Sequence, residues 1–369
     1  MHTMNAIATG HDDIVHDVAY DAYGRLLATC SSDHWIRIFS RKQSNQPWTP
    51  QSGFNAHDAA VFSVAFAPPQ YGVVIASCSE DQSARIHTSA DDGVTFDRLA
   101  TLSDSVGAVH CVAFAIAPAA GLRLACIGTD GVVRVYHAAD PADLRMWHLG
   151  FQQVVDPSQR RSGAYAAAKD MQGDFSLAWC PSAVFTLPSS PLTSDEQQNE
   201  MVDEVSVIER PVDQFVVSSM SYVCVFRRRG LRAYDYAPRE ELPGHTDIVH
   251  DVAWASSAGV AGRYELIATA CRDGYVRIFK LTPRRSAISS DGDAAPEEDM
   301  AYDVALLDQF DDHKSEVWKV SFNASGSVLS SSGDDGRVRF WRPTYSGRFV
   351  SLGVVSAEQQ AMPEDEMED

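Results

Sequence analysis

The sequence of 369 residues lacks the short motifs on which many enzyme active sites are built. No two of its 23 glycines lie two, four or five positions apart, which excludes the dinucleotide-binding fingerprint, the serine-hydrolase elbow and the phosphate-binding loop. None of its 12 histidines is followed by glutamate, so the HExxH helix of zinc proteases is also absent. We therefore expect no enzymatic activity, no catalytic residues, no cofactor and no metal site.

Closely spaced cysteines are missing as well. The 7 cysteines are scattered, and Cys111 and Cys126, the nearest pair, form no CxxC motif. This spacing predicts neither a zinc site nor a redox pair, and we expect reduced thiols of a cytosolic or nuclear protein. The most apolar window, residues 108–128, contains arginine and proline, so no membrane span is predicted.

Positive charge is scarce. The formal net charge is −20, which argues against direct, sequence-independent binding of nucleic acid. The one notable basic cluster, Arg227, Arg228 and Arg229 with Arg232, is interpreted as a solvated hairpin rather than as a contact for phosphate or an acidic partner.

What the sequence does contain is one short phrase repeated five times. An aspartate is followed four residues later by arginine, and two residues after that by an aromatic residue or histidine. A repeat of about 40–45 residues with this ending is typical of the four-stranded blade of a β-propeller. The instances are Asp33/Arg37/Phe39, Asp81/Arg85/His87, Asp130/Arg134/Tyr136, Asp273/Arg277/Phe279 and Asp335/Arg339/Trp341.

A buried polar network explains these residue types. Four units open with a histidine and an alternating apolar stretch, which predicts an inner strand, and a second strand carries a hydroxyl four residues before the aspartate. The aspartate in the following turn can accept a hydrogen bond from the histidine, which can reach the hydroxyl, and an indole can complete the chain. The predicted members are His11, Thr29 and Asp33; His57, Ser77 and Asp81; His245, Thr269 and Asp273; and His313, Ser331 and Asp335 with Trp341. The third unit lacks both the histidine and the hydroxyl.

A sixth unit is hidden between the third and fourth phrases. Residues 175–179, 214–219 and 222–226 read as its strands, with Met220 and Cys224 in place of the aspartate and arginine. The units together predict an all-β WD-repeat propeller of six four-stranded blades over residues 1–356. A polar insertion is expected at about 182–212, an acidic loop at about 286–303 and an acidic disordered tail at 357–369.

The number of predicted strands bears on whether the ring closes. Residues 4–9 can form an outer strand that would complete the last blade of a closed ring, yet residues 347–355 read as an outer strand of that same blade. Six complete blades with a spare strand would leave an unpaired edge, which invites association unless it is covered. We predict an open propeller that is completed in trans by strands of a partner. The alternative is a closed six-bladed ring with a loose N-terminus.

Several segments resemble one family of propellers. Residues 11–18, 23–33, 76–79, 130–136, 317–322 and 331–336 resemble the Sec-thirteen-type propellers, and residues 140–149 with Trp147 resemble the nucleoporin homologues of the Y-shaped nuclear pore subcomplex rather than the vesicle-coat members. The resemblance extends over residues 1–345 and weakens from Phe151 to Glu241.

The resemblance implies an α-solenoid nucleoporin of the Y-complex as the partner that inserts a blade. It also implies a shared use in the vacuolar or lysosomal coat-like complex that regulates the TOR kinase. The implied location is the nuclear pore complex in the nuclear envelope, with the vacuolar membrane periphery as a second site. Carried onto this chain, the partner edges are Asn5, Ala6, Ile7, Ala8 and Thr9 on one side, and Phe349, Val350, Leu352 and Val354 on the other.

Three functions compete at this point. The first is a scaffold subunit of the nuclear pore that supports transport of protein and mRNA. The second is a cage subunit of a vesicle coat. The third is an adaptor propeller that binds a peptide at its central channel, which we expect to be closed and stable alone.

Overall fold

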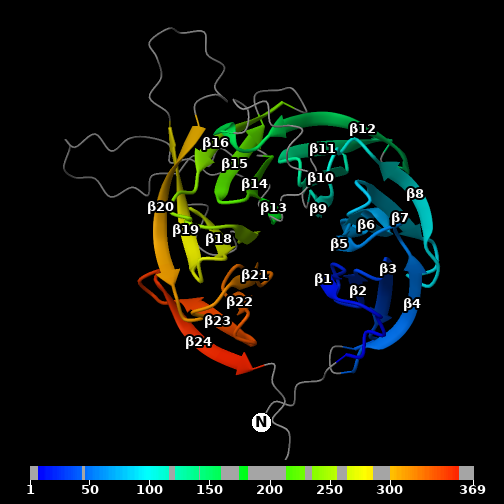
Figure 1. The fold of residues 1–369 in the computed structure, drawn as a ribbon, viewed down its shortest axis with the longest axis horizontal. Coiled ribbons are helices and arrows are strands. Elements are labelled where there is room, and N and C mark those ends of the chain that lie inside the picture. Colours follow the sequence, from blue (N-terminus) through cyan, green and yellow to red (C-terminus); the bar gives the residue numbers. More distant parts are fainter. Residues whose placement is uncertain are drawn as a thin grey trace, which may run out of the picture.

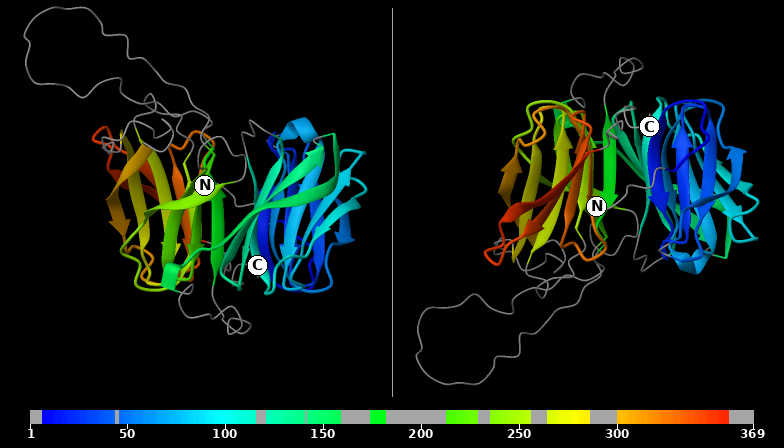
Figure 2. Two further views of the ribbon diagram at one scale, coloured as in Figure 1. Left: turned by 90° about the horizontal axis from the view of Figure 1, so that it is seen from above. Right: turned by 90° about the horizontal axis from the view of Figure 1, so that it is seen from below.

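The computed structural model describes residues 7–43, 46–115, 121–140, 142–158, 174–181, 213–228, 235–255, 264–285 and 300–356. These residues form six four-stranded antiparallel sheets arranged around a central channel, as Figure 1 shows. The sheets stand upright around the channel in the two side views (Figure 2). The prediction of a six-bladed propeller is therefore confirmed.

Each blade is built from consecutive strands, with the first strand of the blade next to the channel (Figure 1). The first three blades are β1 (Val15–Tyr20), β2 (Leu26–Ser31), β3 (Trp35–Ser40) and β4 (Thr49–Asn55); β5 (Val61–Phe66), β6 (Val73–Ser79), β7 (Ala84–Ser89) and β8 (Asp97–Leu102), with the short helix η1 (Pro69–Tyr71); and β9 (Val109–Phe114), β10 (Arg123–Gly128), β11 (Val132–Asp140) and β12 (Asp143–Val154).

The remaining blades follow the same plan. They are β13 (Phe175–Trp179), β14 (Gln214–Ser219), β15 (Tyr222–Arg228) and β16 (Tyr236–Glu241); β17 (Val249–Trp254), β18 (Glu265–Cys271), β19 (Val276–Arg285) and β20 (Met300–Phe310); and β21 (Val317–Phe322), β22 (Leu329–Gly333), β23 (Arg337–Pro343) and β24 (Phe349–Ser356). The strands of the hidden fourth blade begin where the sequence predicts them.

The repeated aspartate marks a turn that requires left-handed backbone. The residue after it has positive φ in each of the five units: 71° at His34, 67° at Gln82, 64° at Gly131, 85° at Gly274 and 65° at Gly336. Aspartate accepts backbone hydrogen bonds in such turns, which stabilises this conformation. The fourth blade instead joins β14 to β15 through two residues, Met220 and Ser221, and this shorter hairpin has no place for the aspartate.

Packing between blades follows one rule. Ala28 and Cys30 on β2 face the next blade, where they share a buried apolar cluster with Val64 of β5. Ala268 and Ala270 on β18 contact Val320 of β21 in the same way. Small residues on the second strand of one blade thus make room for the inner strand of the next, which allows the close packing typical of protein interiors.

The structure corrects two of the predicted segments. No strand contains Ile7, Ala8 or Thr9, whereas Asn5 and Ala6 lie outside the described residues. An extended segment becomes a strand only when it pairs with a neighbour, and β24 already occupies the outer edge of β23. The acidic loop is also shorter than predicted, because β20 begins at Met300. The insertion at 182–212 and the tail at 357–369 lie outside the described residues.

Candidate partner-binding site

The structure brings together the members of the predicted polar network in three blades. His11 Nδ1 lies 2.8 Å from Asp33 Oδ2, and its Nε2 lies 2.9 Å from Thr29 Oγ1. The same two bonds join His57 to Asp81 and Ser77, at 2.9 Å each, and His313 to Asp335 and Ser331, at 2.9 Å each. In the last blade the Trp341 indole donates to Ser331 Oγ at 3.0 Å.

The fifth blade departs from the prediction. His245 Nε2 contacts Thr269 Oγ1 at 2.9 Å, but its Nδ1 contacts the carbonyl oxygen of Leu242 at 3.1 Å instead of Asp273. The Asp273 carboxylate accepts hydrogen bonds from the Thr246 hydroxyl and from Arg277. Thr246, the residue after this histidine, therefore makes the hydrogen bond to the turn aspartate that the histidine makes in the other three blades.

The arginine of the repeated phrase has a role that the sequence reasoning missed. In four of the five units its guanidinium pairs with the turn aspartate four residues earlier, at 2.6 Å for Arg134 and Asp130 and at 2.7 Å for Arg277 and Asp273. Burial alone would raise the pKa of Asp273, but the bonds from Arg277 outweigh burial and lower this pKa to about 2. The constant spacing of the two residues was the available signal, since both lie at the same hairpin.

These networks hold strands together and offer no exposed reactive group. Burial lowers the pKa of His245 to about 4, so this histidine is neutral at physiological pH. Among the described residues, no group of three or more metal-ligating side chains could hold an ion. No disulfide joins the seven cysteines, and burial raises the pKa of Cys111 to about 11. A functional site must therefore be sought in the surfaces of the ring.

One surface breaks the packing rule: the face of the first blade that lies across from the last. Val18 of β1 pairs with Thr29 in the same register as Val64 with Ser77 and Val320 with Ser331. Val64 and Val320 are 3% and 4% exposed, whereas Val18 is 47% exposed.

The end of β1 repeats this contrast. Tyr20 is 57% exposed, whereas Trp254, at the equivalent position of β17, is 6% exposed. The neighbouring blade that covers this face elsewhere is missing here. Figure 1 shows the corresponding interruption between the β1–β4 and β21–β24 sheets.

The facing surface of the last blade has a different composition. Ser330 and Ser332 of β22 occupy the positions that Ala28 and Cys30 occupy in β2, because Ser331 and Thr29 are equivalent in register. Both serines are partly exposed, and so are Val338 and Phe340 on β23. A cavity of about 410 Å³ lies between the two surfaces. We refer to the two faces and this cavity as the open junction; its lining includes Val15, Asp17, Val18, Lys319, Ser330, Ser332 and Val338.

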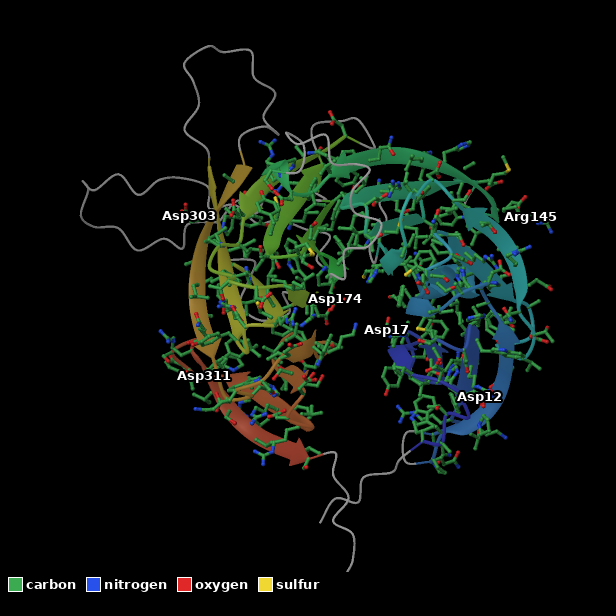
Figure 3. All side chains as sticks on the ribbon, in the orientation of Figure 1. Asp12, Asp17, Arg145, Asp174, Asp303 and Asp311 are labelled. Atoms are coloured by element: carbon green, nitrogen blue, oxygen red, sulfur yellow. The ribbon has the colours of Figure 1, made fainter. Side chains whose placement is uncertain are left out.

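One ion pair crosses the open junction beside the channel. Lys319 Nζ of β21 lies 3.3 Å from Asp17 of β1 and 3.9 Å from Asp251 of β17. Both carboxylates raise the pKa of Lys319. Figure 3 shows Asp17 at the rim of the central channel. At the junction between the fifth and sixth blades, Asp251 accepts the backbone N–H of Val320, but an ammonium cannot accept such a bond. Lys319 therefore cannot accept a backbone N–H from a neighbouring inner strand as Asp251 does. Its side chain instead spans the open junction to Asp17.

The outer strand of the last blade gives a mixed result for the predicted edge. Val350, Leu352 and Val354 are 48%, 58% and 51% exposed, as an edge for a partner requires. Phe349 is buried in the core between the fifth and sixth blades, and its N–H donates to Asp308. Phe349 is therefore not part of an accessible edge, because its ring fills the space beside Trp341.

The interpretation of the basic cluster as solvated is wrong for Arg227 and Arg228, whereas Arg229 and Arg232 lie outside the described residues. Arg227 is buried, with its guanidinium 3.0 Å from Glu240 and over the ring of Tyr302. Arg228 lies 3.1 Å from Asp213. Both arginines anchor β15, and neither supplies a phosphate site. Among the described residues, no helix is long and apolar enough to cross a membrane.

The fold and this site define a class of protein: a six-bladed propeller whose first and last blades share no sheet and face each other across a cavity. Residues 4–40, 48–88, 237–280 and 305–342 match the WD domain, G-beta repeat family. Nucleoporin SEH1 of Saccharomyces cerevisiae is 35% identical to this chain, covering 96% of the chain and 100% of the relative.

Nucleoporin seh1 of Schizosaccharomyces pombe is 33% identical, with 96% of each chain covered. Nucleoporin SEH1 of Homo sapiens is 32% identical, over 96% of this chain and 89% of the relative. The chain therefore belongs to the SEH1 family of WD-repeat nucleoporins. Family membership confirms the prediction of a nucleoporin and its location at the nuclear pore complex of the nuclear envelope.

Proposed function

We propose that this protein is a non-enzymatic scaffold subunit of the Y-shaped nuclear pore subcomplex, and that an α-solenoid nucleoporin completes its ring by inserting a blade into the open junction. The observation that carries the proposal is the exposure of Val18 and Tyr20 at positions that are buried where a blade follows. In this role the protein supports nucleocytoplasmic transport of protein and mRNA by maintaining the pore framework.

Strand insertion suits the surfaces of the open junction. An inserted blade would bury Val18 and Tyr20 on one side and would pack on Val338 and Phe340 on the other. Burying apolar surface contributes about 25 cal/mol per Å², so even a few such side chains add to binding. A solenoid of the vacuolar TOR-regulating complex would meet the same surfaces, and we extend the proposal to that second assembly.

Affinity purification of the tagged full chain tests the proposal. The stoichiometric partner should be an α-solenoid nucleoporin, and Val18→Asp should abolish its recovery because a carboxylate would enter a buried junction. Val94→Asp is the matched control, since Val94 is 51% exposed and lies in the second blade, away from the junction. Recovery of vesicle-coat subunits in place of nucleoporins, or equal recovery with both variants, would contradict the proposal.

A further inference from the structure

A cluster of arginine and aromatic side chains lies beside one end of the open junction. Arg25 Cζ lies over the Tyr23 ring, 5.0 Å from its centroid, and Arg41 Cζ lies 4.4 Å from the centroid of Trp48. The Tyr20 ring contacts Trp48 at 5.7 Å between centroids. We call these five residues the Arg–aromatic patch.

Hydrogen bonds hold the patch in one arrangement. Arg41 Nε donates to the carbonyl oxygen of Gly24 at 3.0 Å, and Arg41 N donates to the carbonyl oxygen of Arg25 at 3.0 Å. Asp21, the acidic residue of this turn, uses Oδ1 to accept the N–H groups of Arg25 and Leu26. The guanidinium of Arg25 makes no ion pair with a carboxylate of the described residues. Arg25 therefore presents positive charge at the patch, on a chain whose net charge is −20.

The patch is continuous with the surface that a partner would cover. Tyr20 belongs to both, because it is the last residue of β1 and its counterpart Trp254 is buried beneath a neighbouring blade. A strand that leaves the junction at this end would pass Tyr20, whose ring contacts Trp48 of the patch.

The facing rim of the last blade has the same character. Lys319 of β21 and Asp17 of β1 occupy equivalent positions and are in contact. The two inner strands therefore run in the same direction and end at the same side of the ring. On that side, the turn between β23 and β24 exposes Tyr345 fully, and Arg342 is exposed beside it, whereas the exposed Arg348 pairs with Asp308 at 2.5 Å. At the other side, Asp13 and Asp334 are exposed together with Arg337, so positive charge is offset by carboxylates at that end of the junction.

We propose that the partner segment flanking the inserted blade is acidic and docks its carboxylates on the Arg–aromatic patch. This inference rests on the proposed insertion, and it adds the chemistry and the position of a second contact. Arg25, held over the Tyr23 ring, keeps its edge available for bidentate bonds to a carboxylate, and such charge-assisted bonds are among the stronger ones at interfaces. Opposite charges also speed association, which favours this end as the point of first contact.

Charge reversal in the full chain bound to its solenoid nucleoporin tests the inference. Arg25→Glu with Arg41→Glu should weaken the complex about tenfold or more at low ionic strength, and the difference should shrink at high ionic strength. Arg98→Glu with Arg145→Glu is the matched control, because both arginines are exposed on outer strands away from the junction and the charge change is the same. Arg41→Gln removes the charge while keeping a side-chain N–H donor for Gly24, so a folding defect can be told apart from loss of the contact.

A zero-length cross-link identifies the facing groups. Arg25→Lys and Arg41→Lys keep the charge and supply an amine, which carbodiimide joins only to a carboxylate in direct contact. Cross-links from positions 25 and 41 to acidic residues next to the inserted segment would support the inference. Unchanged affinity of the charge-reversed variant, with the wild-type complex intact, would overturn the inference and leave the insertion standing. Failure of the wild-type chain to hold any solenoid would overturn both. Binding of a single-stranded oligonucleotide that is lost in the charge-reversed variant would assign the patch to nucleic acid instead.

Discussion

Truncating equivalent valines, one at the open junction and one at the packed junction between the first two blades, distinguishes an open ring from a closed one. Val18→Ala and Val64→Ala remove the same atoms at equivalent positions of β1 and β5. Two buried methyl groups correspond to about 1.6 kcal/mol of transfer free energy, and a cavity left in a packed core adds to this cost. Val64 is 3% exposed, so Val64→Ala should lower the free energy of unfolding by about 2 kcal/mol or more.

Val18 is 47% exposed, so about half of the transfer term applies and solvent fills the space that is left. We expect Val18→Ala to cost the free chain about 0.8 kcal/mol. The other half of the transfer free energy should be lost only when the partner covers this face, and it corresponds to a decrease of about fourfold in the affinity for the partner. Urea unfolding of the free variants and titration calorimetry with the solenoid measure the two quantities. Equal destabilisation of the free chain by both substitutions would refute the reasoning, because it would mean that β1 is covered by the last blade.

Three further predictions concern single side chains of the blades. Trp341→Phe should lower the free energy of unfolding by about 1 kcal/mol, because it removes the indole bond to Ser331 while keeping the apolar ring that blades one and five have at this position, and urea unfolding measures this loss. Burial raises the pKa of Glu265 to about 7, so the stability that its neutral form contributes is present below the unfolded pKa near 4.5 and is lost as pH rises through 7. Glu265→Gln should therefore match wild type at about pH 4 and exceed it at about pH 8 in thermal unfolding, and a constant difference across this range would contradict the assignment. Lys319→Met should lower the unfolding midpoint at neutral pH, because Asp17 and Asp251 lose their shared cation, and the loss should diminish in acid as Asp251, whose pKa burial raises, is protonated; a pH-independent loss would point to packing instead.

The fold could be predicted from the sequence because the residues that define the repeat contact one another within a single hairpin. Aspartate at the turn and arginine four residues later face each other across one hairpin, so their spacing is fixed by the strand itself. The hidden blade was found by alternation alone, although Met220 and Ser221 form a shorter turn. What the local pattern could not show is competition between neighbours, as when Thr246 displaces His245 from Asp273.

The site was predicted only in part, because exposure depends on what covers a strand. β1 has the same alternation as the inner strands that are buried, and nothing in the β1 segment itself tells that Val18 lacks a neighbour. A signal did exist in the last blade, where Ser330 and Ser332 stand at positions that are alanine or cysteine in the first two blades. Phe349 was assigned to the edge because the register of an outer strand depends on its bulge, which lies between Phe340 and Trp341 in the pairing with β23.

The most direct test of the central claim is an experimental structure of this chain bound to the α-solenoid nucleoporin that co-purifies with it. The account predicts a sheet of partner strands between β1 and β21, with Val18 and Tyr20 buried against it. A complex in which the solenoid binds elsewhere and the first and last blades pack directly on each other would contradict it.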